Sequence, residues 1–167
     1  MWFFYLILGL LLFFLQNLLP LPPPLHLDLL TLLMIFLSLR ASPILAVAMA
    51  FFFGVMLDCY GLAPLGLQVG RLFLAVLGVK VLRRHLNFHY IVPQIVGVGL
   101  IMVAQGLFMA LSLHLLLPTP VNYQPLLRQG LFQLTVTALS APLVLALLGL
   151  LEKHWSRFFA IKSSLAD

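Results

Sequence analysis

Long apolar runs, broken only by short groups of prolines, glycines and basic residues, constrain this chain more than any other feature. Of its 167 residues, 63% are hydrophobic and 8% are charged, whereas soluble domains carry about 25% charged residues. A core built from these residues could not be covered by a polar surface. Because several runs reach the roughly 20 residues that span a bilayer, we predict an all-α integral membrane protein.

The breaks between the runs divide the chain into six predicted spans within a single transmembrane domain, residues 1–167. Four prolines after the first run cannot continue a helix, and Ser42-Pro43 is a favourable helix start. The predicted spans cover residues of about 2–19, 25–39, 43–58, 66–82, 90–117 and 126–151, and a polar tail follows. The first run has no basic n-region and no small-residue cleavage site, so we expect it to remain as a spanning helix.

The positions of the lysines and arginines predict the orientation of the six spans. If both termini lie in the cytoplasm, Arg71 and Arg128 fall on the opposite side. The cytoplasmic side then receives Arg40, Lys80, Arg83, Arg84, Lys153, Arg157 and Lys162. This bias follows the positive-inside rule and predicts a bundle with both termini inside. The rule also accounts for the net charge of +5, so we expect the lipid bilayer, and no nucleic acid, as the surrounding partner.

Small residues line one face of the third predicted span. They recur every four residues and lead to an acid: Ala46, Ala50, Gly54 and Asp58. Residues at this spacing share a helix face, and small faces let membrane helices approach closely. The fourth span opens with a similar face at Gly66 and Gly70, after a turn that holds Pro64. We therefore expect these two spans to pack as an antiparallel hairpin.

Asp58 and Arg71 would lie at a similar depth in this hairpin, near the non-cytoplasmic surface. A lone charge at a helix centre costs roughly 2.5–3.5 kcal/mol on insertion scales, and pairing lowers that cost. We predict an Asp58–Arg71 ion pair that locks the hairpin; the alternative is that both side chains snorkel to the headgroups. Asp28 is expected at the same surface, where an acid at the start of the second span is favourable to the helix dipole.

Two acids near one membrane face also suit an intramembrane aspartyl protease, because paired carboxylates can share a proton and activate water. However, Asp28 in HLDLL and Asp58 in MLDCY lack the Asn- and Arg-flanked motifs of lipoprotein signal peptidases. The histidines form no HxxxH or HExxH pair, and no phosphate-binding Gly-rich loop with its Lys is present. We therefore expect no catalytic residues, no metal and no other cofactor.

Polar side chains recur at helical spacing along the last two predicted spans. The sixth span carries Gln129, Gln133, Thr137 and Ser140, and the fifth carries Gln94, Gln105 and Ser112. Such groups hydrogen-bond between membrane helices. They could line a solute cavity, meet a partner helix or join the spans to each other. Pro142 is expected to bend the sixth span.

A short pattern crosses the hairpin, Gly54-Val-Met-Leu57-Asp58 followed by Pro64-Leu65-Gly66-Leu67, and an extended opening, LPLPPPLHLDLLTLLMIFLSLR, precedes it. In these features the chain resembles the bacterial rod shape-determining protein MreD family, most sharply over residues 25–85. The resemblance implies a non-enzymatic scaffold of the inner membrane that binds the single-span protein MreC. Through MreC it would support rod shape and the cell-wall elongation machinery, which includes RodA, its transpeptidase partner and MreB.

The MreD family is also similar in fold to the substrate-binding subunits of energy-coupling-factor transporters. This likeness leaves a second expectation open, a membrane subunit that binds a vitamin or another small molecule. Such a subunit would need a polar-lined cavity between its last two spans and a small-residue surface for its coupling subunit. The stripe of Ala46, Ala50 and Gly54 suits either reading.

Overall fold

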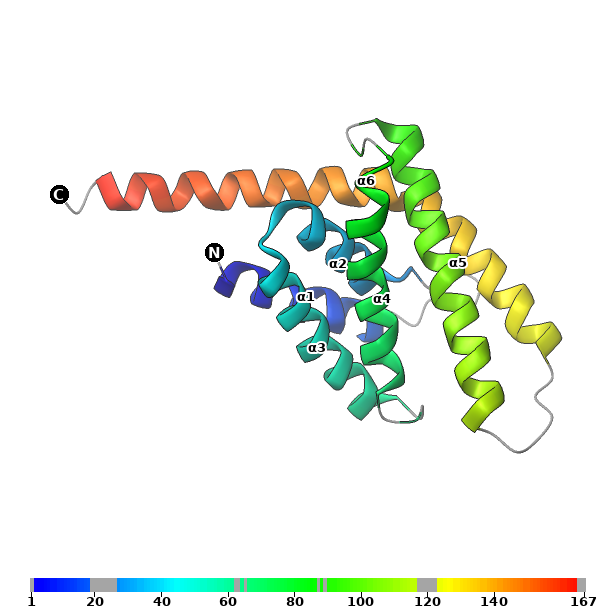
Figure 1. Ribbon diagram of the computed structural model, residues 1–167. Helices are drawn as coiled ribbons and strands as arrows, with labels where there is room; N and C mark the ends of the chain where they lie inside the picture. Colours follow the sequence, from blue (N-terminus) through cyan, green and yellow to red (C-terminus); the bar gives the residue numbers. More distant parts are fainter. Residues whose placement is uncertain are drawn as a thin grey trace.

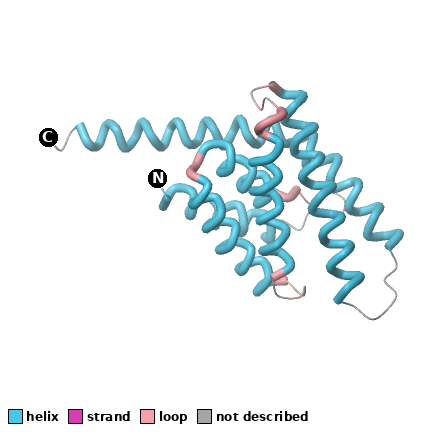
Figure 2. Tube along the Cα trace, viewed as in Figure 1, coloured by secondary structure: helices cyan, strands magenta, loops and turns pink. Residues whose placement is uncertain are grey.

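The computed structural model describes residues 2–18, 27–61, 64, 66–86, 88, 90–116 and 123–164. Within these ranges the chain forms helices and no strand, and Figure 2 shows how little of it lies in loops. The helices are α1 (Trp2–Leu18), α2 (Leu29–Arg40), α3 (Pro43–Tyr60), α4 (Leu67–Leu82), α5 (Ile91–Leu116) and α6 (Tyr123–Ser164). The predicted all-α architecture is therefore confirmed.

Three helices contain stretches that are long and apolar enough to cross a membrane. In the described residues these stretches are Pro43–Tyr60, Ile91–Leu115 and Gly130–Trp155. The helices α1 and α2 are apolar but shorter. The chain thus has the character of a membrane protein, while the count of six spans and their orientation remain predictions.

Local sequence sets the ends of the helices, with two departures from the predicted spans. Ser42 caps α3 through its hydroxyl, which accepts the N–H of Leu45 at 3.4 Å, and Pro43 takes the first helical position as predicted. The second helix begins at Leu29 and not at residue 25, because Asp28 caps it. The sixth helix continues to Ser164, where a polar tail was predicted; no proline or glycine follows Leu151 to end it.

The short helix α2 lies inside the bundle and contacts α1, α3, α4 and α6. Its residues 30–37 are all buried, as expected for a helix that is hydrophobic all round. Twelve residues make a helix about 18 Å long, well short of the roughly 30 Å hydrocarbon layer. Because its neighbours enclose it, α2 does not need the length of a lipid-facing span.

Contacts between the first and last helices place the start of α1 beside the later part of α6. The hydroxyl of Tyr5 donates to Glu152 Oε1 at 2.6 Å, and the rings of Phe4 and Trp155 lie 5.1 Å apart. In Figure 1 the N-terminus and the red end of α6 accordingly lie on the same side of the molecule. This geometry agrees with termini on one side of a membrane, although which side they face remains a prediction.

The helix α6 changes direction between its yellow and orange parts (Figure 1), and Pro142 lies inside this helix. Proline removes a backbone hydrogen bond and its ring pushes against the preceding turn, which bends a helix. The yellow part of α6 runs with α5, while the later part packs against α2. The bend predicted from Pro142 therefore lets α6 contact α5 with its first part and α2 with its later part.

Candidate functional site

Close contact between α3 and α4 confirms the predicted hairpin and its small-residue face. Ala46 and Ala50 are fully buried on α3, and Gly54 is buried with them. A Cβ added to Gly54 would lie 2.6 Å from the Cα of Val69 on α4, closer than any real side chain allows. Hydrogen at this position is therefore what permits the two backbones to touch. Gly70 plays a similar part toward α5, where an added Cβ would meet the ring of Phe108 at 2.7 Å.

Asp58 caps the next helix rather than pairing with Arg71. Its Oδ2 accepts the N–H of Gly66 at 2.8 Å and its Oδ1 accepts the N–H of Gln68 at 2.9 Å. Gly66 has φ +93, a left-handed conformation that glycine adopts without strain. The first N–H groups of a helix lack partners within it, and the helix dipole there favours an anion. Asp58, which lies at the end of α3 and is 4% exposed, supplies both the acceptor for these N–H groups and the acidic side chain at the start of α4.

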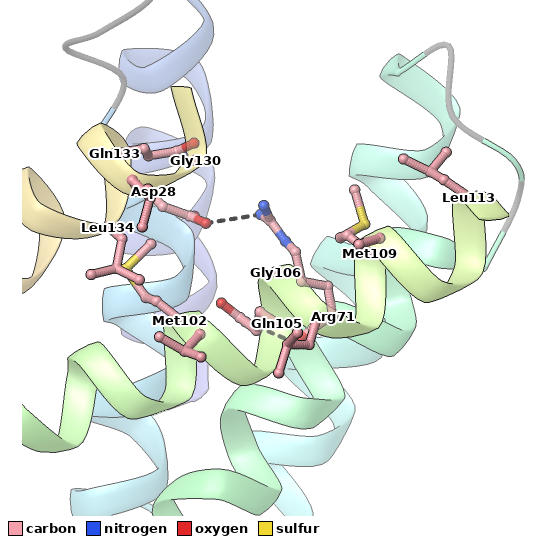
Figure 3. A pocket seen from close by; sticks show the side chains of 14 residues that line it. Asp28, Arg71, Met102, Gln105, Gly106, Met109, Leu113, Gly130, Gln133 and Leu134 are labelled. Carbon is pink, nitrogen blue, oxygen red and sulfur yellow. Dashed lines mark hydrogen bonds and ion pairs between the residues drawn. The ribbon is translucent and has the colours of Figure 1, made fainter. Parts of the chain in front are cut away.

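Arg71 forms its ion pair with Asp28, so the predicted Asp58–Arg71 pair is wrong. Arg71 Nη2 lies 3.0 Å from Asp28 Oδ2, as the dashed line in Figure 3 shows. The other oxygen of Asp28 accepts the N–H of Thr31 at 3.1 Å. One carboxylate therefore caps α2, as its position predicted, and also ties the start of α2 to α4. Arg71 pairs with Asp28 and not with Asp58 because the backbone N–H groups of Gly66 and Gln68 already occupy both oxygens of Asp58.

Gln105 brings α5 to the same place. Its side-chain amide donates to the carbonyl oxygen of Arg71 at 2.8 Å, and the residue is 3% exposed. Arg71 Nε is buried and has no hydrogen-bond partner among the described residues. Arg71 thus contacts α2 through its guanidinium and α5 through its backbone, and it keeps one donor free.

Asp28, Arg71 and Gln105 line a cavity of about 380 Å³ between α4, α5 and α6. Figure 3 shows the Asp28–Arg71 pair reaching across one wall of the cavity, with Met102, Met109 and Leu134 on the walls around it. Gly106 and Gly130 also line it, and a Cβ added at either would meet nothing within 4 Å. The cavity is therefore mostly apolar, with a charged and amide-bearing strip.

The two predicted polar stripes meet this cavity only in part. Gln105 and Gln133 line it, whereas Thr137 is fully buried on α6. Gln94 instead donates to the carbonyl oxygen of Phe88 at 2.7 Å, away from the cavity. The side chain of Gln129 lies outside the described residues. Of the three roles left open for these stripes, Gln105 and Gln133 lie at the cavity, and Gln105 also joins α5 to α4 through its bond to Arg71.

The two carboxylates differ in their partners. Asp28 pairs with Arg71 and Asp58 accepts two backbone N–H groups, so each carboxylate caps a different helix and the two share no partner. Pro64, in the turn before Gly66, is exposed and its carbonyl oxygen accepts the N–H of Leu67 at 3.3 Å.

Sequence reasoning missed the double role of Asp28 and the contact of Gln105 with Arg71. A signal for the first was present, because an acid directly before an apolar run is a typical N-cap. Comparison of the chain with protein-family models, curated proteins and solved structures finds no match in any of the three.

Proposed function

We propose that this chain is a non-enzymatic membrane scaffold that holds an apolar segment of a partner protein in the cavity between α4, α5 and α6. The observation that carries the proposal is the lining of that cavity, which is largely apolar and continues into exposed side chains such as Val103, Leu107 and Leu131. An apolar helix packs in such a groove through close van der Waals contact.

The resemblance to the MreD family names the partner in this proposal. The partner would be the single-span protein MreC of the bacterial inner membrane, and the assembly would serve cell-wall elongation with RodA, its transpeptidase partner and MreB. The free Nε donor of Arg71 supports a partner segment with one hydrogen-bond acceptor among its apolar residues, because a buried donor without a partner is costly.

The second candidate is a subunit that binds a small molecule such as a vitamin. The cavity volume of about 380 Å³ favours it, since ligand pockets usually measure about 300–1,000 Å³. The convergent polar groups Asp28, Arg71, Gln105 and Gln133 would fix the orientation of such a ligand.

Two glycines of α5 provide the test. Gly106 lines the cavity and Gly99 does not, yet an added Cβ meets nothing within 4 Å at either position. Gly106→Leu should fill the cavity without breaking the helix, and Gly99→Leu is its matched control. Each variant is coexpressed with MreC, extracted in mild detergent and purified through a tag on this chain.

In this experiment the wild type and Gly99→Leu should retain MreC in stoichiometric amount, and Gly106→Leu should lose most of it. A small molecule released on denaturation from the wild type, but not from Gly106→Leu, would favour the second candidate. Equal retention of MreC by all three chains would refute the cavity as its docking site.

A further inference from the structure

A second cavity lies at the opposite end of the bundle from the Asp28–Arg71 pair, where α2 and α4 end. Its volume is about 420 Å³, and three arginines and one histidine form its polar lining: Arg40, Arg83, Arg84 and His85. Arg40 is the last residue of α2, whereas the other three follow α4. Segments more than forty residues apart in the chain thus bring their positive charges to one hollow.

The segment that carries Arg83, Arg84 and His85 is held in place. Backbone N–H groups of Arg83, Arg84 and His85 donate to carbonyl oxygens in the last turn of α4. Beyond them, Gln94 of α5 donates to the carbonyl oxygen of Phe88, and a Cβ added to Gly97 would meet the Phe88 ring at 2.7 Å. The ring therefore fits against a glycine of α5. These contacts fix the position of the arginine-bearing turn before any ligand binds.

The charge balance of this hollow is positive. The carbonyl ends of α2 and α4 contribute about half a negative elementary charge each, and three guanidinium groups exceed this by roughly two charges. The two acids Asp28 and Asp58 lie at the other end of α2 and α3 and are bound there. Glu152 accepts the hydroxyl of Tyr5, and Arg40 acts electrostatically on the same hydroxyl, so Glu152 offsets part of the charge of Arg40 from outside the lining. Among the described residues the hollow therefore contains a cationic excess without an acid in its lining.

We propose that this hollow binds a phosphate group, supplied by the headgroup of an anionic phospholipid. Guanidinium forks match the oxygens of a phosphate in bidentate geometry, and the apolar lining residues Leu39 and Phe88 suit the glycerol end of a lipid. If this end of the bundle is cytoplasmic, as the basic residues predict, the anionic inner leaflet supplies the ligand. The site is independent of the scaffold proposal, because it lies at the other end of the bundle.

The test measures how much phosphatidylglycerol the purified full-length chain retains in detergent, by native mass spectrometry, with phosphatidylcholine as the zwitterionic comparison. Arg40→Gln, Arg83→Gln and Arg84→Gln are made singly, so that each chain keeps its excess of basic residues at this end. Each should weaken phosphatidylglycerol binding about fivefold, the effect expected for one basic residue near an anionic lipid surface. Arg128→Gln, the same change at the other end of the bundle, should leave binding unchanged.

Addition of inorganic phosphate separates the two sources of the ligand. Displacement of phosphatidylglycerol at millimolar phosphate would show that the site recognises free phosphate as well. Resistance to displacement would show that it requires the lipid, and either result supports a phosphate site. Equal binding of phosphatidylglycerol and phosphatidylcholine, or equal losses in Arg128→Gln and the three variants, would overturn the proposal.

Discussion

Removal of the cation from the Asp28–Arg71 pair should destabilise the fold strongly at neutral pH. In Arg71→Met the flexible thioether side chain replaces most of the apolar stem of the arginine but leaves Asp28, which is 1% exposed, without its cation. Removal of one partner of a buried ion pair typically costs about 3–5 kcal/mol. The N–H of Thr31 still donates to the carboxylate, so we expect the lower half of that range.

The assay is reversible unfolding in detergent micelles by titration with SDS at neutral pH. The double variant Asp28→Asn/Arg71→Met tests the cause, because Asn caps a helix as well as Asp does and carries no charge. The free energy of unfolding of the double variant should lie within about 1 kcal/mol of the wild-type value. Arg128→Met, an exposed arginine, serves as the control. A loss in Arg71→Met no larger than that in Arg128→Met, or losses that simply add in the double variant, would refute the reasoning.

Substitutions at three positions of the hairpin, Gly54, Asp58 and Gly66, are tested by the same unfolding assay. Gly54→Ala should lower the free energy of unfolding by about 1–3 kcal/mol, because the new Cβ would meet the Cα of Val69 at 2.6 Å. Its control, Gly99→Ala, has open space around the new Cβ and should raise the free energy of unfolding by about 0.5–1 kcal/mol. Asp58→Ala should cost about 2 kcal/mol, the upper end for a helix cap, since two N–H groups lose their acceptor; Asp58→Asn should cost less. Gly66→Ala should cost about 1–2 kcal/mol, although an added Cβ meets no atom there, because φ is +93.

Helix faces and helix starts could be predicted, because they depend on a few neighbouring residues. The pairing of the charged side chains could not. The four-residue spacing of Ala46, Ala50 and Gly54 fixes a helix face whatever lies opposite, and the Ser42-Pro43 start acts within one turn. The partner of Arg71 depends instead on which acceptor reaches it first in three dimensions. Two acids were expected at the same surface, and the choice between them depends on the backbone N–H groups of α4, which no side-chain pattern displays.

The same limit applies to the cavity. Its glutamines could be identified from their spacing on the last two spans, but not which of them would face inward, because α6 bends and packs against two different neighbours. Gln105 and Gln133 line the cavity, while Gln94 holds the turn at Phe88. A polar stripe therefore predicts that a helix face contacts protein. Which neighbour each polar side chain contacts depends on how the helices bend and pack, as α6 does around Pro142.

The Asp28–Arg71 pair belongs to both the core and the cavity wall, so stability and binding must be separated by different variants. Arg71→Met removes a contact that joins α2 to α4 and should therefore weaken the fold and any binding together. Gly106→Leu changes the shape of the wall at a position where an added Cβ meets no atom within 4 Å. It should therefore weaken binding without lowering the free energy of unfolding, which should rise slightly because a helical glycine is replaced. If Gly106→Leu also destabilised the fold, the helices α5 and α6 would already be closed on each other there, and the cavity would be a gap in the core and not a site.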